Sequence, residues 1–148
     1  MSTTPIEAHF EETHEVRNQV PEFGPCDLWA TDAVLREAVT REGAVAFAAH
    51  LGGYGRLAGD ALYRLSWDAH RDRPRLRTHD RFGKRIDRVE FHPAYHEIMG
   101  AAICGGVAGL SWATQAWQLP EVGAHVARAA LSYLHHQVEP GSSCPLTM

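Results

Sequence analysis

The chain has 148 residues, of which 45% are hydrophobic, and it carries a formal net charge of −4 with a pI near 6.2. This length and apolar content suit one domain with a packed core, and the acidic balance argues against a nucleic-acid-binding module. The sequence has no apolar run approaching about eighteen residues, and its polar N-terminus lacks a secretion signal, so we expect a soluble, cytoplasmic protein without a membrane partner.

Residues 1–24 contain two prolines and several acidic side chains but no sustained helical period. Because proline interrupts both helices and strands, this segment is predicted to be an extended arm. The helical domain is then placed at residues 25–141.

Helical segments are predicted from Asp27 onward. Asp27 and Thr31 are alternative N-caps for the first helix, because a short side-chain oxygen can accept from the first-turn amides. A second helical piece over residues 44–51 is expected to be interrupted at Gly52-Gly53, and a third runs over residues 54–67.

In residues 74–91 the helical pattern gives way to an alternating one. Apolar and arginine residues alternate before the turn signature Asp80-Arg81-Phe82-Gly83. Gly83 supplies the positive φ of a tight turn, so this stretch is predicted to be a short β-hairpin or an extended excursion between helices. Basic residues cluster from Arg64 to Arg88, with aspartates between them. Two interpretations remain for this cluster: a solvated surface, or a patch that faces phosphate or CoA.

Pro93 is predicted to begin another helix, since its missing N–H has no intrahelical partner there. The closing helix begins after Gly123 and should end near Pro140-Gly141, and one apolar stripe marks its inner face: Val126, Ala130, Leu134 and Val138. Residues 142–148 are predicted to start a strand. The fold class is therefore mainly α, an up-and-down helical bundle with one short extended or hairpin excursion.

Histidines are the first candidates for chemistry. His92 and His96 have a spacing that can hold a metal on a helix, but Pro93 puts His92 at the helix edge, and the HExxH pattern is absent. We therefore expect one to cap the helix and the other to pack. Three further histidines in the closing helix are expected to have structural or helix-dipole roles: His125, His135 and His136.

Other catalytic patterns are missing. No GxSxG elbow, phosphate-binding glycine loop or CxxC pair occurs, so neither a catalytic nor a metal-binding residue is assigned. Three isolated cysteines are expected to be buried thiols: Cys26, Cys104 and Cys144.

Four stretches carry a family resemblance: THEVRNQV (residues 13–20), DAVLREAVTREGA (32–44), RIDRVEFHPAYHEIM (85–99) and AHVARAALSYLHHQVEPGSSCPLTM (124–148). Together they resemble the N-terminal helical domain of the acyl-CoA dehydrogenase superfamily, in its adaptive-response, AidB-type branch. The resemblance runs from about Thr13 onward and corresponds to roughly the first third of a family member.

The resemblance implies a parent flavoprotein that binds FAD, acts as an oxidoreductase on CH–CH bonds and is linked to the adaptive response to DNA alkylation. It also implies a homo-oligomer whose catalytic base, flavin pocket and DNA-contacting surface lie in β- and C-terminal regions beyond residue 148. By this resemblance, the predicted strand at 142–148 leads into that β-domain. Met148 becomes a candidate contact at the flavin edge, and this portion alone is expected to be inactive.

A second hypothesis comes from another functional class. The chain would be a free-standing helical interaction module that has lost the flavin domains. Its partner surface would then be the apolar face left bare, together with four tryptophans: Trp29, Trp67, Trp112 and Trp117.

Overall fold

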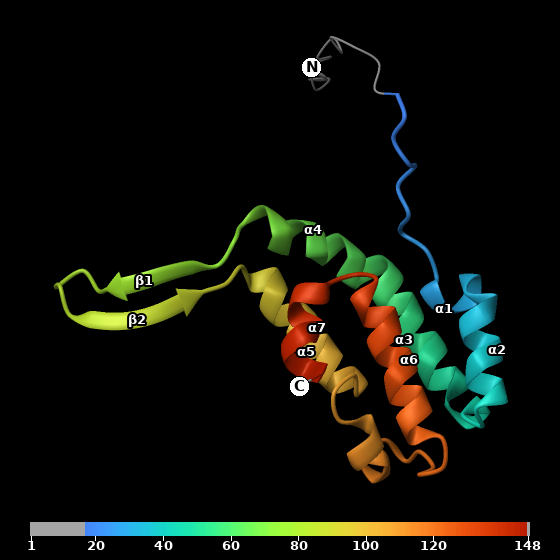
Figure 1. Ribbon diagram of the computed structural model, residues 1–148. Coiled ribbons are helices and arrows are strands. Elements are labelled where there is room, and N and C mark those ends of the chain that lie inside the picture. The colour runs from blue at the N-terminus through green and yellow to red at the C-terminus, as the bar shows by residue number, and fades with distance from the viewer. Residues whose placement is uncertain (1–16, 148) are drawn as a thin grey trace, which may run out of the picture.

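The chain folds into a bundle of helices from which one two-stranded hairpin projects (Figure 1). This computed structural model describes residues 17–147. In chain order the elements are α1 (Leu28–Thr31), α2 (Ala33–Arg41), η1 (Val45–Phe47), α3 (Ala48–Leu57), η2 (Ala58–Leu62), α4 (Tyr63–Arg71), β1 (Arg75–His79), β2 (Arg85–Glu90), α5 (Pro93–Gly105), η3 (Leu110–Trp112), η4 (Thr114–Trp117), α6 (Ala124–His136) and α7 (Pro140–Thr147). The mainly α fold class is confirmed. The predicted 1–24 arm has neither helix nor strand over residues 17–24, and residues 1–16 lie outside the described part.

Two aspartates begin the first helices. Oδ1 of Asp27 accepts from two backbone amides of α1 at 2.9 and 3.1 Å, which confirms Asp27 as an N-cap. Thr31, the alternative, lies inside α1, and its hydroxyl donates to the Asp27 carbonyl at 2.7 Å. Asp32 caps α2 instead, accepting from the amide of Leu35 at 2.8 Å.

Helix α3 runs through Gly52-Gly53, so the predicted interruption there is wrong. It continues through the π-helical turn η2 into α4, and the three segments form one long rod (Figure 1). The glycines allow α1 to approach this rod: a Cβ at Gly55 would lie 2.6 Å from Cβ of Trp29, and one at Gly59 would clash with the Cys26 carbonyl oxygen. Tertiary packing against α1 thus offsets the helix-weakening effect of about 1 kcal/mol per glycine.

Strands β1 and β2 pair antiparallel, which confirms the hairpin rather than an irregular excursion. Gly83 has a φ of +83° in the turn, where Oδ1 of Asp80 accepts the backbone amides of Phe82 and Lys84 at 2.8 and 2.9 Å. Asp87, with a φ of +44°, lies where the register shifts, as in a β-bulge.

Five of the nine arginine and lysine side chains in the basic cluster of residues 64–88 form ion pairs with acids. Ion pairs join Arg64 to Asp60, Arg75 to Asp72, Arg77 to Glu90 and Arg85 to Asp87, at 2.7 to 3.2 Å. All members of these pairs are at least partly exposed, so the structure favours the interpretation as a solvated surface.

The core lies between the α3–α4 rod, α5 and α6. Its largest fully buried apolar side chains are Phe47, Leu51, Ile98, Leu110, Leu131 and Leu134. Ala130 and Leu134 of the predicted stripe are buried and Val126 is partly buried, as a helix with one inward face requires. Val138 is also buried but lies beyond His136, where α6 ends, earlier than the predicted end near Pro140-Gly141.

The chain from Pro140 to Thr147 is helical, so the strand predicted to start at 142–148 is wrong over the described residues. Helix α6 ends at His136, and Pro140 occupies the first position of α7. Glu139 stabilises this start, because its Oε1 accepts the Gly141 amide at 2.7 Å and its carbonyl accepts the hydroxyl of Ser143 at 3.0 Å. Local capping thus outweighs the weak extended pattern of the final residues.

Candidate functional site

Three polar side chains from three helices form a buried hydrogen-bonded chain. The Tyr54 hydroxyl of α3 lies 2.8 Å from Nδ1 of His135, in the last turn of α6. Nε2 of His135 lies 2.9 Å from Oγ of Ser142 on α7, and that hydroxyl lies 3.2 Å from the Glu139 carbonyl oxygen. The chain therefore ties α3, α6 and α7 together at one point.

The direction of each bond follows from the carbonyl at its end. The Ser142 hydroxyl donates to the carbonyl of Glu139, so its oxygen accepts from Nε2–H of His135. A neutral imidazole has one donor and one acceptor, and Nδ1 therefore accepts from the Tyr54 hydroxyl. This arrangement satisfies every side-chain group in the chain only while His135 is neutral.

Burial enforces that neutral state. It lowers the pKa of His135 to about 4, with a smaller contribution from the charge of His136, and it raises the pKa of Tyr54. The expected structural role of His135 is confirmed, but a role as a cation at the helix dipole is wrong, because the ring is fully buried. His135 is also out of reach of a substrate.

Beside this chain, Glu139 is a carboxylate whose side chain is only 5% exposed. Its Oε2 lies 3.0 Å from Nε2 of His70 at the end of α4, while Oε1 accepts the amide of Gly141. A pocket of about 240 Å³ opens here between α4, the base of the hairpin, α5 and α7. Phe91 and Tyr95 stack in its wall, with ring centroids 4.4 Å apart.

This pocket can accept a hydrogen-bond donor at Glu139, which already pairs with His70, but the described residues show no nucleophile beside its histidines. The described residues place no serine or cysteine against His70 or His92, and Nδ1 of His92 is used as the N-cap of α5, accepting from Ala94 at 3.2 Å. We therefore assign a structural role to the contact between His70 and Glu139.

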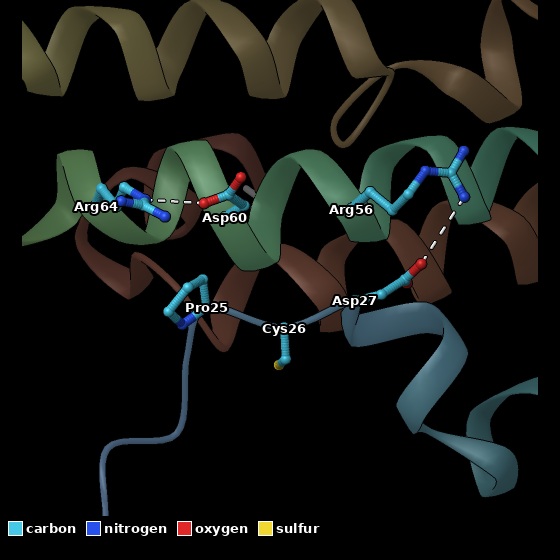
Figure 2. A pocket seen from close by; sticks show the side chains of 6 residues that line it. All are labelled: Pro25, Cys26, Asp27, Arg56, Asp60 and Arg64. Carbon is cyan, nitrogen blue, oxygen red and sulfur yellow. Dashed lines mark hydrogen bonds and ion pairs between the residues drawn. The ribbon is translucent and has the colours of Figure 1, made fainter.

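A second hollow, of about 330 Å³, lies where the segment before α1 crosses the α3–α4 rod (Figure 2). Asp27 pairs with Arg56 at 3.8 Å, and Asp60 pairs with Arg64 at 2.8 Å. Cys26 lies between them and is half-buried. Because each cation in this hollow has an acidic neighbour, no uncompensated charge is left to attract an anion.

His92 and His96 have different roles in the structure. His92 caps α5, and His96 packs edge-on against Phe91 at 5.9 Å between ring centroids, which confirms the cap and packing roles. Within residues 17–147, no three His, Cys, Asp or Glu side chains are grouped to hold a metal. The expectation of buried cysteines is wrong for Cys104 and Cys144, which are exposed. Met148 lies outside the described residues.

Sequence reasoning missed Tyr54, Glu139 and His70. Tyr54 is far from His135 in sequence, and Glu139 falls at the predicted end of the closing helix rather than at the start of another one. The available signal was the Glu-Pro-Gly-Ser-Ser run, in which a polar residue before Pro matches a helix start.

Neither the interior of the bundle nor the hollow in Figure 2 has the features of a flavin site. The interior is closed by fully buried Leu51, Ile98 and Leu131, and the arginines of the hollow in Figure 2 are paired with carboxylates. A dinucleotide cofactor needs a cleft and donors for its phosphates. Every helix in residues 17–147 is also too short or too polar to cross a bilayer.

Several apolar side chains remain on the surface of the bundle. The large ones on its helices and connections include Trp67, Ile103, Trp112, Val122 and Tyr133.

Comparison with known proteins extends this description. Residues 18–148 match the family described as "Adaptive response protein AidB N-terminal domain". The chain is 42% identical over 138 residues to the AidB protein of Escherichia coli (strain K12), which is named among the acyl-CoA dehydrogenases. The match covers 93% of this chain and 25% of that protein, so the chain spans about a quarter of its relative rather than the expected third.

The fold also has a solved counterpart. The structure of Caenorhabditis elegans ACDH-11 in complex with C11-CoA superposes with a TM-score of 0.72 at 20% sequence identity. The superposition covers 96% of this chain and 24% of that one. The same bundle thus forms the corresponding quarter of a longer protein.

Proposed function

Because the chain belongs to the AidB N-terminal domain family, we propose that it is the N-terminal helical domain of a longer, FAD-dependent, acyl-CoA dehydrogenase-like protein. The observation that carries this proposal is the match of residues 18–148 to that family, together with 42% identity to a relative of which the match covers only 25%. We further propose that the whole protein takes part in the adaptive response to DNA alkylation in the cytoplasm; the family description names an adaptive response protein, and the rest follows from the resemblance.

The domain's role in this proposal is to support other domains rather than to perform chemistry. When FAD is bound, it supplies the redox chemistry, and the protein supplies orientation and electrostatics. The polar side chains of the Tyr54–His135–Ser142 chain are buried and hydrogen-bonded to one another, and the exposed apolar side chains fit docking against the remaining domains and against other subunits of a homo-oligomer. Met148 remains a candidate at the flavin edge, and any contact with DNA is assigned to the C-terminal region.

A chimera tests this proposal. The 148-residue chain would replace the equivalent quarter of the E. coli relative, and the purified product would be examined for a bound flavin by its visible spectrum. We expect the chimera to retain FAD and the isolated chain to bind none at micromolar concentration.

Two results would contradict the proposal. Stoichiometric FAD binding by the isolated chain would place the cofactor site inside this bundle. A folded chimera without flavin would favour the free-standing interaction module instead.

A further inference from the structure

The pocket beside Glu139 has the shape of a small-molecule site. Its volume is about 240 Å³, and it lies where the end of α4, the base of the hairpin, α5 and α7 meet (Figure 1). Four of the side chains that line it are apolar or aromatic: Ala69, Pro74, Phe91 and Tyr95. Sites for small molecules are concave and mostly apolar, and a few polar groups in them fix the orientation of the ligand.

The carboxylates in the lining set the charge of this pocket. They belong to Asp72 and Glu139, and no lysine or arginine among the described residues lines it. Asp72 pairs with Arg75 at 2.7 Å, which compensates its charge. Glu139 has no lysine or arginine of residues 17–147 within 4.0 Å, and its ionic neighbour is His70, so its charge is uncompensated while that imidazole is neutral.

Glu139 also has unused acceptor capacity. Its Oε1 accepts the Gly141 amide at 2.7 Å, and its Oε2 lies 3.0 Å from Nε2 of His70. A carboxylate has roughly four acceptor positions, so these two contacts leave about half of them open. Only 5% of the side chain is exposed, so little water can reach these positions. A buried carboxylate of this kind is stabilised by a cation that donates hydrogen bonds to it.

We propose that this pocket binds a small primary amine with an apolar substituent. Its ammonium group donates to Oε2 of Glu139, and its substituent lies against the wall that contains the stacked rings of Phe91 and Tyr95. An ammonium is compact and has three donors, which suits the open positions of one oxygen in a narrow pocket. An anion is repelled by the carboxylates, and a neutral ligand leaves the charge of Glu139 uncompensated.

Calorimetric titration of the 148-residue chain tests this inference with 2-phenylethylamine as the probe. The control for the ring without the charge is 2-phenylethanol, and the control for the charge without the ring is methylamine. We expect the probe to bind and both controls to bind at least about tenfold more weakly, because each lacks one of the two contacts.

Two variants separate the binding site from the helix junction to which Glu139 belongs. Glu139→Gln keeps a side-chain oxygen for the Gly141 amide but removes the charge, so we expect binding to weaken by about tenfold or more. His70→Ala breaks the contact with Glu139 from the other side and leaves the carboxylate in place, so this variant should bind at least as tightly as the unchanged chain.

The matched control is Glu37→Gln, because Glu37 is an exposed carboxylate of α2 that does not line the pocket. This variant should bind the amine as the unchanged chain does. Far-ultraviolet circular dichroism verifies that each variant is folded.

Three results would overturn the inference: no binding of the amine at millimolar concentration, equal binding of the alcohol, or unchanged binding by Glu139→Gln. Loss of binding in His70→Ala as well as in Glu139→Gln would also overturn it, since the effect would then belong to the junction. The inference goes beyond the proposed function and does not depend on it, because the titration needs neither flavin nor the other domains. The two proposals can therefore fail separately.

Discussion

Oε2 of Glu139, before α7, lies 3.0 Å from Nε2 of His70 on α4, and Oε1 of the same carboxylate accepts the backbone amide of Gly141 at 2.7 Å. One buried side chain therefore joins the far end of the α3–α4 rod to the start of the last helix. The carbonyl of the same residue accepts the hydroxyls of Ser142 and Ser143. The helical course of residues 140–147 depends on this junction.

Replacement of Glu139 should weaken that junction. Glu139→Ala removes the acceptor of the part-buried Gly141 amide and the partner of His70, so we expect the free energy of unfolding in urea to fall by about 0.5–2 kcal/mol. Glu37 on α2 is exposed and is the control: Glu37→Ala should change stability by no more than about 0.5 kcal/mol. Equal effects of the two changes would show that the carboxylate of Glu139 does not stabilise the start of α7.

The stability of the chain should depend on pH through His135. Its pKa is lowered from 6.5 to about 4 in the folded state, so the unfolded chain binds the proton more tightly. Stability should therefore be complete above about pH 6.5 and decrease as the pH falls toward 4, by roughly 3 kcal/mol from this group.

Urea titrations at several pH values measure this effect. In His135→Gln the loss of stability between about pH 6.5 and pH 4 should be smaller than in the unchanged chain, because the variant lacks the titrating ring. The same pH slope in both proteins would assign the effect to other histidines or carboxylates.

Removal of the Tyr54 hydroxyl should act on the same ring. Tyr54→Phe leaves Nδ1 of His135 without its donor, so we expect a loss of about 1–3 kcal/mol and a rise in the pKa of His135. A double-mutant cycle with Ser142→Ala should show coupling of at least about 0.5 kcal/mol, since both bonds end on one imidazole. Additive losses would mean that the two hydrogen bonds act independently.

Two glycines in α3 provide a matched test of its packing against α1. A Cβ at Gly53 has no heavy atom within 4 Å, so Gly53→Ala should stabilise the helix by about 0.5–1 kcal/mol. A Cβ at Gly55 would lie 2.6 Å from Cβ of Trp29 and 2.8 Å from its backbone nitrogen, so Gly55→Ala should destabilise the chain by about 1–3 kcal/mol. Thermal or urea unfolding compares the two, and the same sign for both would contradict this packing.

Features that depend on neighbours in the sequence were predictable. Asp27 as a cap, Pro93 at the start of α5, the turn at Asp80–Gly83 and the apolar stripe of α6 each follow from local chemistry within a few residues. The family resemblance was also readable, because it rests on long segments, and the match of residues 18–148 confirms it.

Features that depend on distant residues were decided by the tertiary structure. The sequence by itself determined that Gly52-Gly53 weakens a helix, but only the close approach of Trp29 to the rod decides that the helix continues through it. The sequence likewise placed His135 near the C-terminus of a helix, where a cation is favoured. Only burial between Tyr54 and Ser142 keeps that ring neutral, because the cost of desolvating a charge exceeds the attraction of a helix dipole.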